Sequence, residues 1–102
     1  AMQYLKAEKP RVLFISFDET DAQGHAGRYD RLLASAHKVD DYIRRVWETV
    51  QEMPEYKGTT TLVITTDHGR GEPPETWKSH SILIPGSAYI WAAFLGPDTE
   101  PL

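Results

Sequence analysis

The sequence contains no cysteine, and this absence removes several kinds of site at once. Disulfide bonds, thiolate-bound metals and cysteine nucleophiles are all excluded. No run of lysine and arginine occurs in the 102 residues, and the formal net charge is -4, so a nucleic-acid partner is not expected. No apolar run reaches the roughly 20 residues that a membrane-spanning helix needs, so no membrane segment is expected either. The remaining composition is that of one small globular domain or of a piece of a larger one.

Three short apolar runs and one long periodic stretch give the outline of the fold. The runs at 11–17, 59–66 and 89–95 are rich in β-branched and aromatic residues, which is typical of buried strands. Between the first two, apolar residues recur every three or four positions over 28–53, which predicts one long amphipathic helix. A strand, a crossover helix and a second strand predict a parallel, right-handed pair. The sequence therefore predicts an α/β fold with a mostly parallel sheet.

Residue types that bind metals follow the first two predicted strands. Asp21 and His25 come after the first strand, and their spacing of four places them on one face if the segment forms a helical turn. Asp67 and His68 follow the second strand directly, and His80 lies in the next loop. The carboxyl ends of neighbouring parallel strands lie at one edge of a sheet, so we expect these five side chains to converge. Two acids and three imidazoles favour a pair of divalent ions, zinc or manganese rather than calcium or magnesium.

Each of these candidate positions can also be explained as a structural or surface residue with no role in binding or catalysis. The acidic segment after residue 17 can be a solvated loop, and Asp67-His68-Gly69 can be a strand that ends in a turn. His37, on the predicted helix, is interpreted as a structural or surface residue. Lys78 and Arg70 are weak candidates for contact with an anionic substrate, and the alternative for both is a solvated surface position.

The order of the motifs resembles the carboxy-terminal half of the alkaline phosphatase superfamily. The motif DxxGHxG at 21–27 precedes the long helix, TTDHG follows at 65–69, and His80 precedes IPG at 84–86. The superfamily includes alkaline phosphatases, nucleotide pyrophosphatases/phosphodiesterases, cofactor-independent phosphoglycerate mutases, phosphopentomutases and sulfatases. The resemblance covers 11–97 and implies a three-layer α/β/α sandwich.

The resemblance also implies roles for individual residues. Carried over, Asp21, His25 and His80 hold one metal ion, and Asp67 and His68 hold the other. The activity implied is hydrolysis of an ester, or a phosphomutase reaction, by in-line displacement. A small phosphate ester is favoured over a sulfate ester as substrate, because three histidines suit two zinc or manganese ions better than a single calcium.

The same resemblance shows what the chain lacks. The superfamily places another metal-binding aspartate and a serine or threonine nucleophile well upstream of DxxGH, but only ten residues precede the first predicted strand here. We therefore expect residues 1–102 to be a single fragment, the carboxy-terminal portion of a larger catalytic domain, with no catalytic nucleophile and little activity when isolated.

Two other hypotheses stay open at this point. The chain can be a non-catalytic α/β module that uses metal for folding or for partner binding, or it can bind no metal at all. If the chain is a fragment, one helix cannot cover both faces of three strands. We therefore expect an exposed apolar face that self-associates or packs on the missing half of the fold. The sequence specifies neither the individual substrate nor the cellular compartment.

Overall fold

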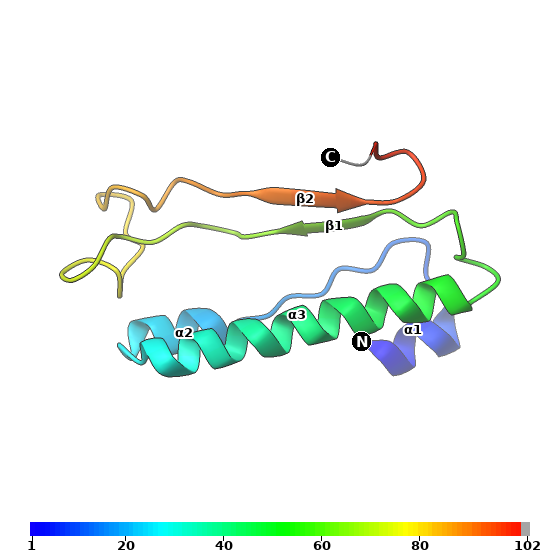
Figure 1. Cartoon of the computed structure of the whole chain (residues 1–102), viewed down its shortest axis with the longest axis horizontal. Helices are drawn as coiled ribbons and strands as arrows, with labels where there is room; N and C mark the ends of the chain where they lie inside the picture. Colours follow the sequence, from blue (N-terminus) through cyan, green and yellow to red (C-terminus); the bar gives the residue numbers. More distant parts are fainter. Residues whose placement is uncertain (101–102) are drawn as a thin grey trace.

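The longest element of the fold is helix α3, Tyr29–Glu52, in a computed structural model that describes residues 1–100 (Figure 1). This helix confirms the prediction for 28–53. Its apolar stripe faces inward, and Val50 is one of its buried residues. The helix ends because Met53 adopts an extended conformation (φ −84°, ψ 121°), as the residue before a proline is expected to do.

Two short helices pack near the ends of α3. Helix α1, Met2–Glu8, buries Leu5, and Lys9 directly after it forms an ion pair with Glu55 in the turn that follows α3. The hydroxyl of Tyr56 donates to the carbonyl of Pro10 at 2.8 Å, which fixes the same junction. Helix α2, Glu19–His25, contacts α3 near the other end of the molecule. None of the helices between residues 1 and 100 is long and apolar enough to cross a membrane.

The two strands of the described chain are antiparallel, and this corrects the predicted fold class. Strand β1, Leu62–Thr65, pairs with β2, Ala92–Leu95, with Leu62 opposite Leu95 and Thr65 opposite Ala92. The prediction of a mostly parallel sheet in a three-layer α/β/α sandwich is therefore wrong for residues 1–100. A parallel neighbour needs a crossover that returns the chain to its starting edge, usually through a helix. Residues 66–91 contain no helix and simply reverse the chain, which gives the antiparallel pair (Figure 1).

The apolar run 11–17 is extended but forms no strand. Its trace runs from α1 to α2 in the same direction as β1 (Figure 1), but within residues 1–100 the sheet consists of β1 and β2 alone. Leu13 and Ile15 are half-buried, whereas Val12 and Phe14 are each 87% exposed. The β-branched and aromatic composition of the run indicates an extended chain correctly, but a strand also needs a hydrogen-bonded neighbour, and within residues 1–100 none pairs with it.

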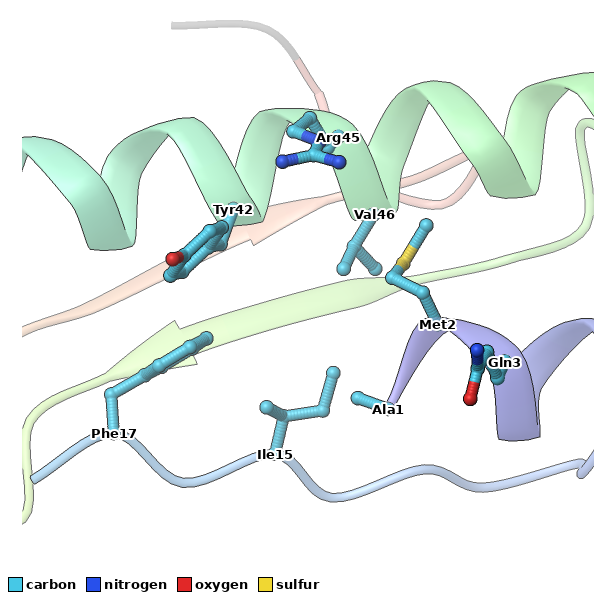
Figure 2. A pocket seen from close by; sticks show the side chains of 8 residues that line it. All are labelled: Ala1, Met2, Gln3, Ile15, Phe17, Tyr42, Arg45 and Val46. Atoms are coloured by element: carbon cyan, nitrogen blue, oxygen red, sulfur yellow. The ribbon is translucent and has the colours of Figure 1, made fainter.

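An open apolar pocket lies between the extended segment 11–17, the start of α1 and helix α3. Its volume is about 390 Å³, and Figure 2 shows Ile15 and Phe17 on one side of it and Tyr42 and Val46 of α3 on the other. The rings of Phe17 and Tyr42 stack with their centroids 6.0 Å apart. Among the described residues the buried hydrophobic side chains are only Leu5 and Val50. Much of the apolar surface of the chain is therefore uncovered.

Candidate metal centre

Three segments carry the predicted ligands to one place. Helix α2 presents Asp21 and His25 one turn apart, as their spacing of four predicts. Asp67 and His68 follow the end of β1, and His80 lies in the loop between the strands. The sequence predicts that the carboxyl ends of parallel strands bring these residues together. In the structure a short helix, one strand end and a folded loop do so instead.

The turn at Gly69 fixes the segment that carries Asp67 and His68. The amide of Gly69 donates to the carbonyl of Ser87 at 2.8 Å. A Cβ atom on residue 69 would lie 2.2 Å from the carbonyl oxygen of Gly86 and 2.6 Å from that of Tyr89, so only glycine fits against this loop. The close contact brings the end of β1 against the loop 86–89 that follows His80.

Three of the candidate ligands lie at short distances from one another. The Nε2 atoms of His25 and His80 are 2.9 Å apart. Nε2 of His25 is 3.3 Å from Oδ2 of Asp21, and Nε2 of His80 is 3.5 Å from Oδ1 of the same carboxylate. Asp21 is thus the common neighbour of the two imidazoles.

His68 joins this group from the other side. Its Nε2 atom lies 3.7 Å from Oδ1 of Asp21, and its ring stacks on His80 with centroids 3.6 Å apart. Nδ1 of His68 faces the carbonyl oxygen of Gly69 at 2.8 Å. A proton on Nδ1 donates to this carbonyl and leaves the lone pair on Nε2, the arrangement that metal-binding histidines use.

Asp67 lies at the outer edge of the group. Its side chain is 89% exposed, and Oδ2 is 3.7 Å from Nε2 of His68. The other carboxylate oxygen accepts a hydrogen bond from the amide of His68 at 3.0 Å. Asp67 and His68 therefore present a carboxylate oxygen and an imidazole nitrogen to the same small volume, close to solvent.

A set of three residues satisfies the spacing that a metal ion requires. Asp21, His68 and His80 each offer one ligand atom, and these atoms all lie within 4.8 Å of one another. All three are partly buried, so a bound cation would be only partly screened by water. The described chain can therefore hold a divalent metal ion at this place, in agreement with the divalent metals that the superfamily uses.

The two candidate substrate contacts, Arg70 and Lys78, and the helix residue His37 differ in their exposure and in their contacts. The Arg70 side chain is 19% exposed and contacts Asp21, so it is not the solvated surface residue that was one alternative. Lys78 is exposed near the end of α2, with Nζ 2.9 Å from where a Cβ on Gly27 would lie. His37 is exposed on α3, which agrees with a surface position. The contact of Arg70 with Asp21 has no signal in the sequence, because 49 positions separate the two residues.

Comparison with known proteins identifies the family. The family model of type I phosphodiesterases / nucleotide pyrophosphatases matches residues 1–83. The 2,3-bisphosphoglycerate-independent phosphoglycerate mutase of Gracilaria tenuistipitata var. liui is 32% identical over 76 residues, which is 70% of this chain and 14% of that protein. The enzymes of the same name from Aliivibrio fischeri (strain MJ11) and Vibrio cholerae serotype O1 are each 31% identical over 80 residues, or 76% of this chain.

The matches cover most of this chain but only a small part of each relative. The chain spans about 15% of the length of these curated relatives. No solved structure matches the chain. The family model nevertheless covers most of the sequence, and so the chain belongs to the type I phosphodiesterase / nucleotide pyrophosphatase family, within the alkaline phosphatase superfamily.

Proposed function

We propose that this chain supplies the metal-binding part of an enzyme that acts on phosphoric esters by in-line displacement with two divalent ions. The observation that carries the proposal is the convergence of Asp21, His68 and His80 within 4.8 Å, with His25 2.9 Å from His80. These residues come from three segments that are distant in the sequence. Their convergence at one place favours a metal centre over unrelated surface residues.

The first ion is assigned to Asp21, His25 and His80. Metal–ligand bonds of about 2.0–2.2 Å at a tetrahedral angle separate two donor atoms by about 3.3–3.6 Å. The separations from Asp21 to His25 and to His80 are 3.3 and 3.5 Å, in agreement with this geometry. The two Nε2 atoms lie 2.9 Å apart, which is the distance of an N–H···N hydrogen bond, and they would separate by about 0.4 Å to bind one tetrahedral ion together. The donor set therefore fits a zinc or manganese ion.

The second ion is assigned to Asp67 and His68. Their ligand atoms are 3.7 Å apart and lie close to solvent, so this pair forms only part of a coordination shell. When bound, the two ions would polarise the phosphoryl group and lower the pKa of the hydroxyl nucleophile. We place the remaining ligand and the nucleophile outside residues 1–102, since the chain covers about 15% of its curated relatives.

The names of the family and of the relatives favour a phosphoric over a sulfuric ester. The family is described by phosphodiesterase and nucleotide pyrophosphatase activities, and the relatives are phosphoglycerate mutases. Hydrolysis of a phosphate ester and transfer of its phosphoryl group both fit the proposed centre. A small anionic substrate would be attracted by the ions, with Lys78 as a candidate contact beside α2.

The direct test is the metal content of the purified chain after exhaustive dialysis against zinc- or manganese-containing buffer and then metal-free buffer. The unchanged chain is expected to keep close to stoichiometric metal, and His25→Ala is expected to lose it. His37→Ala is the matched control, because it removes an exposed histidine from α3 and should leave the metal content unchanged. Absence of metal in the unchanged chain would contradict the proposed centre.

The catalytic part of the proposal needs a separate measurement. A longer protein that includes an upstream catalytic segment is expected to hydrolyse an aryl phosphate, and Asp67→Asn in that protein is expected to abolish the reaction. The isolated chain is expected to show little turnover. Bound metal without any activity in the longer protein would instead support a non-catalytic metal-binding module.

A further inference from the structure

The guanidinium of Arg70 lies between the segments that carry the candidate ligands. Its Nη2 atom donates to the main-chain carbonyl of Asp21 at 3.0 Å and also to Oδ1 of the same residue. Its Nη1 atom donates to the carbonyl of Trp77 at 3.2 Å. Arg70 follows His68 by two positions, and Trp77 precedes His80 by three. One side chain therefore connects α2 and the segment after His68 with the part of the loop 71–79 that precedes His80.

Gly24 provides the space that this guanidinium occupies. A Cβ atom on residue 24 would lie 2.6 Å from Cζ of Arg70 and 2.8 and 2.9 Å from its two terminal nitrogens. Gly24 is buried within α2, where glycine is otherwise a poor helix former. The glycine of the DxxGH motif thus has a structural role in this chain: it leaves room for the guanidinium, and any larger residue would displace Arg70 from Asp21.

The carboxylate oxygen that Arg70 contacts is also the one nearest to two imidazoles. Oδ1 of Asp21 is 3.7 Å from Nε2 of His68 and 3.5 Å from Nε2 of His80. A carboxylate oxygen can accept two interactions, so one side of Oδ1 can face Arg70 while the other faces the imidazoles. The two main-chain carbonyls hold the guanidinium independently of the carboxylate, which leaves Oδ1 available for a cation.

We infer that Arg70 is a positioning residue of the proposed metal centre, and that Gly24 is required because it admits the guanidinium. Arg70 orients the carboxylate of Asp21 toward His25 and His80, its partners on the first ion, and remains in place when an ion binds. This inference rests on the proposed metal centre. It differs from contact with a substrate anion, because the hydrogen bonds of the guanidinium are made to Asp21 and Trp77.

The inference is tested by the affinity of the full 102-residue chain for zinc, measured by competition with a chromogenic chelator. Loss of a group that orients a metal ligand weakens binding by about 10–100-fold, which is the effect expected for Arg70→Gln. Arg70→Lys keeps the charge but loses the planar fork, so it is expected to restore only part of the affinity. Arg44→Gln is the matched control, because it removes an exposed arginine from α3 and should leave the affinity unchanged.

A second variant separates positioning from general loss of structure. Gly24→Ala improves the helix propensity of α2 but crowds Arg70, so it is expected to weaken zinc binding while the helical circular dichroism signal is kept. Combined with Arg70→Gln, the same change should cost little more, because the crowded group is gone. The ligand-field bands of the cobalt-substituted chain are expected to change in Arg70→Gln and Gly24→Ala, and not in Arg44→Gln. If Arg70→Gln fails to fold, Gly24→Ala alone decides the question.

Three results would contradict the inference. Tighter binding by Arg70→Gln would mean that Arg70 competes with the ion for Asp21, and unchanged binding would mean that it does not orient the carboxylate. Additive losses from Gly24→Ala and Arg70→Gln would mean that the glycine acts independently of the arginine. Absence of zinc binding by the unchanged chain is a different outcome, since it would overturn the proposed function together with this inference.

Discussion

Two regions of this molecule are stabilised in different ways. Around the candidate metal centre, polar side chains such as Arg70 and His68 are partly buried and bonded to neighbouring segments. Along 11–17 the opposite holds, because large apolar side chains such as Val12 and Phe14 face solvent. The comparison indicates that the centre is held by contacts within the chain, whereas several large apolar side chains of 11–17 face solvent. We expect a second copy of the chain or the rest of a catalytic domain to cover them.

The largest effect is expected for Asp21→Asn, because this residue contacts three histidines and Arg70. The change should abolish metal retention and lower the free energy of unfolding by about 1–3 kcal/mol, since it leaves the mostly buried guanidinium without its charged acceptor. Metal analysis and thermal unfolding measure the two effects. In the metal-free chain, Asp67→Asn is the matched control for stability, because Asp67 is 89% exposed and its loss should leave the unfolding midpoint unchanged.

An intermediate effect is expected for Phe14→Glu in the apolar region. We expect the unchanged chain to self-associate through its apolar face, unless the rest of a catalytic domain covers that face. Burial of one large apolar side chain contributes about 1.5–3 kcal/mol, so the variant should weaken association about ten- to hundredfold in sedimentation experiments. It should also bind less of a hydrophobic dye, while its metal content stays the same.

Ser16→Glu is the control for this experiment, because it adds the same charge at an exposed polar position of the same segment. A chain that remains monomeric at high concentration and binds no dye would contradict the expected self-association. Loss of metal from Phe14→Glu would show that the two regions depend on each other, and the distinction between them would then fail.

The smallest effect is expected for Glu55→Gln, far from the centre. The hydrogen bond from Lys9 lowers the pKa of Glu55 below its ordinary value of 4.5, and the same hydrogen bond raises the pKa of Lys9. A carboxyl group with a lowered pKa contributes stability above its unfolded-state pKa, and this contribution is lost as the pH falls through the folded-state value.

The measurement that checks this prediction is thermal unfolding of both chains across the acidic range. Glu55→Gln should unfold slightly earlier than the unchanged chain at neutral pH, and the difference should disappear in acid. Because both side chains of the pair are exposed, added salt should also reduce the difference. A difference that grows in acid would contradict the assigned ion pair, and metal content should be unaffected throughout.

The sequence predicts the helices of this chain better than its sheet. Helix α3 begins and ends within one residue of the predicted range 28–53, because its apolar periodicity and Pro54 are local signals. The pairing of β1 with β2 depends on how residues 66–91 fold back, and no local pattern specifies that path. The run 11–17 has the composition of a strand, but its neighbours decide whether it becomes one.

In the candidate site, too, local sequence patterns predict one part and tertiary packing decides the other. The position of Asp21 one turn before His25 could be predicted, because the spacing of four is a local property of a helix. The short distance between His25 and His80 is expected both from adjacent parallel strands and from the family resemblance, and the structure reaches it without a parallel sheet. The sequence predicts for Arg70 only a weak substrate contact or a solvated surface position, since its place against Gly24 depends on tertiary packing.

The distance along the chain between the facing imidazoles links metal binding to folding. His25 and His80 are separated by 55 positions, and the entropy lost on closing a loop grows with its length. Helix α2 can form through local contacts, but the return of His80 to it requires most of the chain to be in place. An ion held by both residues would act as a cross-link between the two halves of the sequence, so that uptake of metal and completion of the fold become a single equilibrium.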